Sequence, residues 1–549
     1  MNSPKGFWAD LFSKERNSLF LLIPFLGIAW VWTSSLSFVP VPWPDDSAFY
    51  FPAKDLFSYP PHWIMTPQAP FEPTYREWNF NTMPLFPVLI GIFRAVGIDG
   101  SHALKLLPLA GWLCSTVLIL NALVRDRANR FVLIGAALLL TFDPVLRWHS
   151  VLMRPESWIG AMGVFLVIGY RFGWPHFLRE RRYFHPASLA LWTGAMLHFN
   201  ALHLVSIVIV LYFGDWRKIL KIGALTAAGL LPWVCTVALH FDLFQTQMAL
   251  QFNRLVGYEN PWLTNLTDFE NALIPDMGSP EPWPHVLKNA FLFCVLALPL
   301  LVGTAARIIQ KTKNDHPQAR SRVRTLTASF TWLLSALYLW HTKAEVWFTG
   351  YFHLAYWLFA LLVLHEISKS PVTFPGQKLS KLFSVFPLLL GGLFFYETVA
   401  QAARLSADPT WRWDTYGEWV NCVDRFLVQE HRRKGAPEKF RVWGPTFPDI
   451  LIELSRKHPK WEFTRTNDFT SRSDLALAHG KEVDAVVVTE FYRHDQRTSE
   501  GKLTDYPEAR SVWMNWEGYF LNTLQRDPNF KPNRNLCQRG RWDAFIYFK

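Results

Sequence analysis

Long apolar stretches alternate with short charged ones from Asn17 to about Val399. A membrane-spanning helix needs about 20 predominantly apolar residues to cross roughly 30 Å of hydrocarbon. The stretches that meet this requirement are 18–39, 106–124, 222–241, 289–306, 325–342, 346–365 and 382–396. Shorter ones at 131–146 and 157–170 suffice if the helix tilts or the bilayer thins. So many apolar runs do not fit one soluble core, and the pattern predicts a multi-pass α-helical membrane protein.

The stretch 18–39 is too long for the core of a signal peptide, and no small-residue cleavage site follows it. We therefore expect it to remain as the first membrane helix.

The formal net charge of +11 raises the question of nucleic-acid binding, so the positions of the charges matter. Up to residue 400, 22 of the 31 Lys and Arg residues fall in six patches. These patches are the N-terminus, 125–130, 171–182, 217–221, 307–324 and 369–381. Since Lys and Arg favour the cytoplasmic side of a membrane, the patches predict topology, with the N-terminus inside. Nucleic acid is not an expected partner.

The segment 186–214 has no Asp, Glu, Lys or Arg over its 29 residues, and basic patches flank it on both sides. As one helix it would be about 43 Å long, too long for one crossing and too short for two full ones. Two cytoplasmic flanks require an even number of crossings. We therefore predict two short helices that meet at a turn near His198, Phe199 and Asn200. Irregular backbone at that depth must be buried in protein or line a wet cavity, so this turn is expected to face a site.

The complete path has about eleven crossings, with outer loops at 40–103 and 241–286. It divides the chain into a transmembrane catalytic domain, 1–401, and an extracytoplasmic α/β domain, 402–549. In the second domain, 440–443, 483–489 and 542–548 have the pattern of strands, and 449–457 has that of a helix. The oxidising side of the membrane permits a disulfide between Cys422 and Cys537, although the sequence leaves their distance open.

Two adjacent carboxylates, Asp45 and Asp46, open the first outer loop. Such groups repel each other, and partial burial raises the pKa of at least one. A carboxylate of raised pKa suits a general base, which takes a proton from a hydroxyl or an amine. The same Pro-Asp-Asp-Ser pattern is also a good helix start, because Asp and Ser cap free N–H groups. The residues alone leave both interpretations open.

The next outer turn carries Arg147, His149, Arg154 and Glu156. The guanidinium of Arg154 has the fork of donors that holds a phosphate. In the alternative interpretation Arg154 anchors the helix at the interface, and Glu156 occupies a first turn where the helix dipole favours an acid. Both interpretations remain open here too.

Polar groups also mark the predicted short-helix turn, at His198, Asn200 and His203. A lone intramembrane His often only bonds to a neighbouring helix, but three polar groups at one turn favour a cavity lining. Lys343 and Tyr351 lie at the same outer side of the membrane. His353 and Glu345 accompany them, and the simpler interpretation of Lys343 is an ammonium that snorkels to the interface. Ionisable groups at and inside a membrane are functional candidates by default, and here four clusters converge on one side.

The acidic pair with Phe49 and Tyr50 behind it resembles the start of the GT-C glycosyltransferases, in particular protein mannosyltransferases and aminoarabinose transferases. Further segments are similar to segments of that family and come in the same order. Residues 81–87 are similar to its Pro-Leu segment, residues 154–157 to its Arg-Pro-Glu turn, and residues 197–200 to its short-helix turn. Phe199 stands where that turn often has proline, and Asp46 where many relatives have Glu. The resemblance spans about residues 18–365.

The resemblance implies an inverting transfer of a sugar from a polyprenyl-phosphate donor to a lipid, glycan or protein acceptor. Asp45 would deprotonate the acceptor, with Asp46 as the second catalytic carboxylate. Arg154 and Lys343 would bind the donor phosphate. The residues that would bind the substrate are Glu156, His198, Asn200, Tyr351 and His353.

No cofactor is required by this scheme, although Asp46, Glu156 and His198 could ligate a divalent metal. The expected location is a bacterial inner membrane, with the site and residues 402–549 on the periplasmic side. The main alternative is a transporter or flippase for a lipid or glycan, although the internal repeats frequent in transporters are not evident. A non-catalytic scaffold of envelope assembly is the third possibility.

Overall fold

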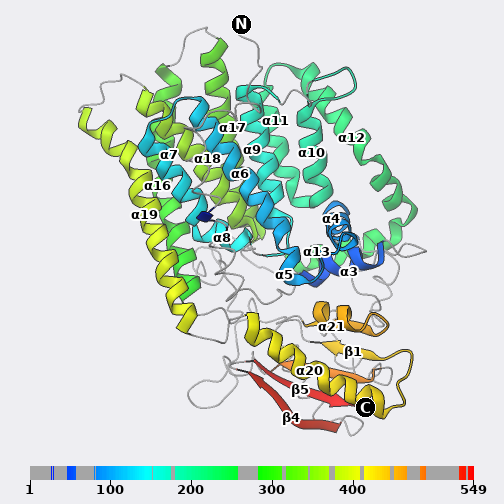
Figure 1. Ribbon diagram of the computed structural model, residues 1–549. Helices are drawn as coiled ribbons and strands as arrows, with labels where there is room; N and C mark the ends of the chain where they lie inside the picture. The colour runs from blue at the N-terminus through cyan, green and yellow to red at the C-terminus, as the bar shows by residue number, and fades with distance from the viewer. Residues whose placement is uncertain are drawn as a thin grey trace.

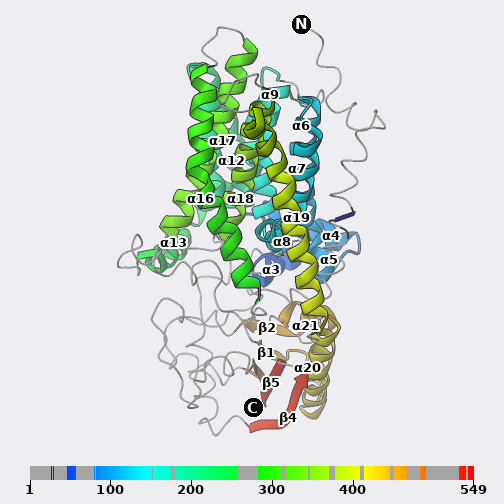
Figure 2. The ribbon, with the colours of Figure 1, turned by 90° about the vertical axis from the view of Figure 1, so that its left-hand side faces the viewer.

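The computed structural model describes residues 26–27, 29, 46–56, 80, 82–150, 152–174, 178, 180–256, 282–311, 317–343, 347–369, 377–407, 413–444, 450–465, 483–489, 531–539 and 542–548. The chain forms a helical bundle with a smaller sheet-containing region at one end (Figures 1 and 2). Most of the predicted first helix, 18–39, and Asp45 lie outside the described residues.

The bundle helices coincide with the apolar stretches of the sequence. They are α6 (Leu106–Arg125), α7 (Arg130–Phe142), α9 (Glu156–Phe172), α10 (Pro186–Leu197), α11 (Leu204–Leu211), α12 (Trp216–Leu239), α16 (Pro282–Lys311), α17 (Pro317–Lys343), α18 (Trp347–Lys369) and α19 (Gln377–Ala407). Three segments of the described chain are by themselves long and apolar enough to cross a membrane: α6, α12 and Gly350–Ile367 of α18. The multi-pass helical fold is thus confirmed, and the number of eleven crossings stays a prediction.

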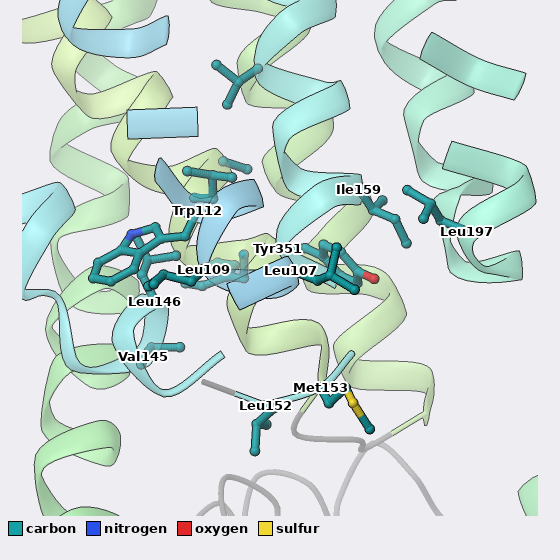
Figure 3. Packing of buried hydrophobic residues seen from close by; sticks show 14 of the residues in the cluster. Leu107, Leu109, Trp112, Val145, Leu146, Leu152, Met153, Ile159, Leu197 and Tyr351 are labelled. Atoms are coloured by element: carbon teal, nitrogen blue, oxygen red, sulfur yellow. The ribbon is translucent and has the colours of Figure 1, made fainter. Parts of the chain in front are cut away.

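The spans differ in how much protein surrounds them. In the most apolar window of α18, 94% of the residues are buried, against 6% in that of α12. Helix α18 is therefore central, and α12 lies at the periphery with Leu231 and Val234 exposed, as expected for a lipid-facing helix. The centre is filled by large apolar side chains of several helices, such as Trp112, Ile159 and Tyr351 (Figure 3).

The predicted break in the segment 186–214 is confirmed. Helix α10 ends at Leu197, a 3-10 turn η3 occupies Phe199–His203, and α11 begins at Leu204. The chain returns to the side from which it came, because the ring of His185 before α10 lies 5.5 Å from the ring of Tyr212 after α11. With 12 residues, α10 is about 18 Å long, well short of the roughly 30 Å of hydrocarbon. The turn therefore lies inside the bundle.

Short helices gather at the end of the bundle that faces the sheet, which we call the sheet-proximal end (Figures 1 and 2). They are α3 (Asp46–Leu56), α4 (Leu85–Ala95), α5 (Ser101–Leu104), α8 (Pro144–Ser150) and α13 (Phe241–Val256). The segment before α4 is attached to α13, since the Phe80 amide donates to Oε1 of Gln247 at 2.7 Å. The Phe80 ring packs on Trp233 and Phe244.

The C-terminal region is a five-stranded mixed sheet of order β2-β1-β3-β5-β4. Its elements are α20 (Trp413–Arg433), β1 (Arg441–Gly444), α21 (Leu451–Lys457), β2 (Glu462–Arg465), β3 (Ala485–Thr489), β4 (Lys531–Arg539) and β5 (Trp542–Phe548). Strands β1, β2 and β3 are parallel, whereas β5 runs antiparallel to β3 and β4. The predicted strands and helix are present, while α20, β2 and β4 were not predicted. Helix α19 continues to Ala407, past the predicted boundary at 401/402.

Helix α20 covers the sheet with an apolar face that includes the buried Trp419, Val423 and Leu427. A disulfide joins Cys422 of this helix to Cys537 of β4, with their Cα atoms 5.7 Å apart. The pairing that the sequence left open is therefore formed.

Candidate active site at the sheet-proximal end

Asp46 is a fully buried carboxylate at the start of α3. Its Oδ1 accepts a hydrogen bond from the Met153 amide at 3.2 Å, and its Oδ2 lies 3.8 Å from Nζ of Lys105. Burial lowers the pKa of Lys105 to about 8, although the Asp46 carboxylate opposes the shift. Asp46 is therefore in direct contact with the loop before α9, and Figure 3 shows Met153 of that loop.

Arg154 and Glu156 form a buried ion pair at the mouth of α9. Nε and Nη2 of Arg154 both donate to Oε1 of Glu156, at 2.9 and 2.8 Å. The other carboxylate oxygen, Oε2, is buried and has no hydrogen-bond partner within the described chain. The Arg154 guanidinium also lies 5.9 Å from the ring of Phe49 on α3. A phosphate that binds Arg154 would therefore share it with Glu156.

The short-helix turn presents His203 toward α17 and α18. Nδ1 of His203 contacts the Asn200 carbonyl, and because a carbonyl can only accept, this nitrogen carries the proton. The ring lies parallel to that of Trp332 on α17, at an angle of 5°, and 4.9 Å from that of Tyr351 on α18. Its Nε2 is a buried acceptor without a partner among the described residues. Nδ1 of His198 caps the turn by accepting from the Asn200 amide at 3.1 Å.

Tyr351 joins two of the predicted clusters. Its side chain is buried beside the His203 ring and within electrostatic reach of Glu156 and Arg154. His353, two residues further along α18, instead points its Nδ1 to Oδ2 of Asp143 at 3.0 Å. Of the predicted site residues, Tyr351 thus lies with His203, whereas His353 belongs to a group around Asp143.

Asp143 organises a group that sequence reasoning missed. This buried carboxylate follows α7 directly, and it also accepts from the Leu146 amide and from Nε1 of Trp357, both at 2.8 Å. The signal in the sequence is an Asp-Pro pair that ends an apolar run in the same turn as Arg147. Lys105 was missed as well, because a lone Lys before an apolar helix has the pattern of an interfacial anchor.

Glu156 lines a small cavity of about 20 Å³, which is enough volume for one water molecule. His149, Ser157 and Gly350 line it together with apolar residues of α6 and α18. A Cβ at position 350 would lie 2.7 Å from Cδ2 of the buried His149, so a larger residue there would have to displace that ring. The start of α18 therefore packs directly on α8.

Two predicted site residues cannot be placed in full. Asp45 lies outside the described residues. Lys343 is the last residue of α17, just before α18 and Tyr351, but its side chain is outside the described part.

Among the described residues, one group has acidic and histidine ligand atoms close enough to share a metal ion: Asp126, His365 and Glu366. It lies where α6 and α18 end, away from the sheet. Arg171 already forms ion pairs with both of its acids, and Arg322 with Glu366. These guanidinium groups supply the positive charge that a cation would bring, so the group is an ion-pair network. The suggested ligands Asp46 and Glu156 are likewise paired with Lys105 and Arg154.

This arrangement places carboxylates, a guanidinium and the neutral acceptor of His203 among buried residues. In such surroundings fixed charges stabilise developing charge more strongly than in water. The set of side chains is therefore chemically suited to a reaction in which a hydroxyl or amine loses a proton while an anionic group departs.

Comparison with known proteins agrees with the fold. The chain is similar to the crystal structure of the oligosaccharyltransferase of Archaeoglobus fulgidus, with a TM-score of 0.50 and 13% identity over 88% of this chain and 70% of that one. At this identity the similarity shows the fold alone. The resemblance noted from the sequence is therefore confirmed at the level of the fold.

Weaker similarities exist to two other structures. One is ArnT from Cupriavidus metallidurans bound to undecaprenyl phosphate, with 11% identity over 96% of this chain and 97% of that one and a TM-score of 0.40. The other is the arabinosyltransferase EmbB from Mycobacterium smegmatis, with 13% identity over 89% and 45% and a TM-score of 0.34. No protein-family model and no curated protein sequence matches the chain.

Proposed function

We propose that this integral membrane protein is an inverting glycosyltransferase that moves a sugar from a polyprenyl-phosphate donor to an extracytoplasmic lipid, glycan or protein. The observation that carries the proposal is the convergence of Asp46, Arg154 with Glu156, and Tyr351 with His203 at one end of the bundle. The GT-C fold supports it, and so does the order of the motifs along the chain.

In this proposal Asp45 takes the proton from the acceptor while the acceptor oxygen or nitrogen attacks the anomeric carbon. The bond from that carbon to the phosphate oxygen breaks, and the lipid phosphate leaves with the electron pair. Attack from the side opposite the leaving group inverts the configuration. The contact of Asp46 with Lys105 and Met153 gives the second carboxylate the role of keeping the start of α3 in place.

The departing phosphate is stabilised by Arg154 and Lys343 in this scheme. Glu156 offers Oε2 and His203 offers Nε2 as hydrogen-bond acceptors for sugar hydroxyls, since buried polar groups normally have partners. Tyr351 packs beside the His203 ring and lies within electrostatic reach of Glu156. His198 and Asn200 act through the turn that holds His203, and His353 acts from the adjoining Asp143 group. No step requires a metal ion.

We assign the sheet-proximal end to the extracytoplasmic side. The basic patches predict this orientation. The disulfide between Cys422 and Cys537 supports it, because disulfides persist in oxidising compartments such as the periplasm.

The test is transfer of radiolabelled sugar from a panel of undecaprenyl-phosphate sugars in proteoliposomes that contain an envelope lipid extract as acceptor. We expect transfer by the wild type and at least a hundredfold slower transfer by Asp45→Asn, in line with loss of a general base. Equal rates would contradict the role of Asp45. Movement of the labelled lipid across the bilayer without transfer would instead establish the transporter.

A further inference from the structure

The carboxylate of Asp99 connects the bundle to the sheet region. Its Oδ1 accepts hydrogen bonds from Tyr50 Oη at 3.2 Å and Arg94 Nε at 3.0 Å. The amide of Gly100 donates to the same oxygen at 2.8 Å. Its Oδ2 lies 3.7 Å from Nε of Arg456, which belongs to α21 beside the sheet. One carboxylate thus joins α3, α4, the start of α5 and α21.

Arg456 can approach this closely because position 100 has no side chain. A Cβ on Gly100 would lie 2.6 Å from Nη1 of Arg456, a distance shorter than the Cβ contacts found in proteins. The φ of +102° at Gly100 also favours glycine. Glu453 holds the guanidinium from within α21 at 2.7 Å. The Arg456 side chain is therefore oriented toward Asp99 by its own helix.

Two of the elements that meet at Asp99 carry the buried ion pair of the candidate site. Asp46 and Tyr50 are separated by one turn of α3 and lie on the same face. Lys105 directly follows α5, whose N-terminal neighbours are Asp99 and Gly100. The Arg94 guanidinium also lies 4.5 Å from the centre of the Tyr50 ring, which fixes that side chain from a second direction. Asp99 is therefore connected, through α3 and α5, to both Asp46 and Lys105.

We propose that Arg456 is a positioning residue, through which the sheet region holds the Asp46–Lys105 pair in the geometry used for transfer. Helix α21 packs against α3 at the junction of the two regions (Figures 1 and 2). The sheet region then acts on turnover, and not only as a surface on which an acceptor could bind. The kinetic part of this inference rests on the proposed function, whereas the structural part does not.

The structural part is tested by hydrogen exchange of the backbone amides of Asp46–Leu56 in nanodiscs. The Arg456 and Asp99 side chains are 37% and 29% exposed. Loss of such a partly exposed ion pair changes the equilibrium constant for local opening by up to about fivefold. We expect Arg456→Gln to raise the exchange rates of α3 about two- to fivefold while those of α9 stay constant. Arg456→Lys keeps the charge and should restore most of the protection. Unchanged exchange in α3, or an equal rise throughout the bundle, would overturn the proposal.

The kinetic part uses the same variants in the transfer assay. Arg456→Gln should lower kcat about two- to fivefold at constant acceptor KM, and Arg456→Lys should recover it. The matched control is Arg433→Gln, an exposed Arg of α20 that pairs with Glu430 in the same region, and it should change neither readout. A higher acceptor KM at constant kcat would show that the sheet region binds the acceptor, and would overturn the proposal. Absence of transfer by the wild type would contradict the proposed function, while the exchange result would still decide the structural coupling.

Discussion

Replacing Lys105 with Met removes the positive charge that faces Asp46 inside the protein. The two groups are 3.8 Å apart, and neither side chain has any exposed surface. Removal of one partner from a buried pair costs about 3–5 kcal/mol, because the other charge is left without compensation. The Met153 amide still donates to Asp46, so we expect the lower end of that range, about 3 kcal/mol.

The double variant Asp46→Asn/Lys105→Met contains neither charge. Its free energy of unfolding should therefore return to within about 1 kcal/mol of the wild type, so the second substitution recovers about 2 kcal/mol of the cost of Lys105→Met. The control is Lys434→Met in the sheet region. Lys434 lies 3.1 Å from Asp484, but these side chains are 21% and 27% exposed. Loss of such a partly exposed pair should cost less than about 1 kcal/mol.

The assay is equilibrium unfolding in mixed detergent micelles with increasing dodecyl sulfate, followed by tryptophan fluorescence. Two results would refute the reasoning: an equal cost for Lys105→Met and Lys434→Met, or a double variant no more stable than Lys105→Met. Since the double variant should fold, its transfer rate separates stability from catalysis. A wild-type rate would show that the Asp46 carboxylate is dispensable for transfer.

Three further changes test other parts of the structure. Asp143→Leu should lower the unfolding free energy by about 3 kcal/mol or more, because it leaves the buried donors of His353, Trp357 and Leu146 without an acceptor. Asp143→Asn can still accept hydrogen bonds and should cost less in the same micelle assay. His203→Leu should weaken sugar-donor binding up to about tenfold, the loss of one hydrogen bond, with unchanged affinity for undecaprenyl phosphate by titration calorimetry; an equal loss for both ligands would contradict sugar contact. Burial opposes the shift, but hydrogen bonds from His458 and Lys457 lower the pKa of Asp424. A carboxyl group whose pKa is lower in the folded than in the unfolded state stabilises the fold at pH values above the unfolded pKa. Asp424→Asn should therefore lower the free energy of unfolding at pH 6, and its difference from the wild type should shrink below about pH 4. A difference in unfolding free energy that is constant with pH would contradict this.

A large part of the bundle was predictable from the sequence. The apolar lengths located the bundle helices, because a fixed hydrocarbon thickness selects segments of a certain length. The break at His198 to Asn200 followed from the same constraint together with the basic flanks. The convergence of the polar clusters was predictable too, since residues in loops on one side of a membrane share a single surface.

The contacts within the site depended on the tertiary structure. Asp46 meets the Met153 amide 107 residues away, and His353 meets Asp143 across 210 residues. Helix lengths and charge counts do not determine which side chains face each other, because that depends on the rotation and crossing angle of each helix. Arg154 illustrates the difference: its position at the outer turn was predictable, but its pairing with Glu156 was not.

The sequence by itself determined that this chain crosses a membrane several times and carries its acidic and basic candidates at one end. Both results follow from the cost of placing charge and unpaired backbone in hydrocarbon, which each segment meets locally. Only the tertiary structure decided that Asp46 pairs with Lys105, that Tyr351 packs beside His203, and that Arg456 reaches Asp99. These contacts arise from close packing of elements far apart in the chain, and no local pattern records that packing.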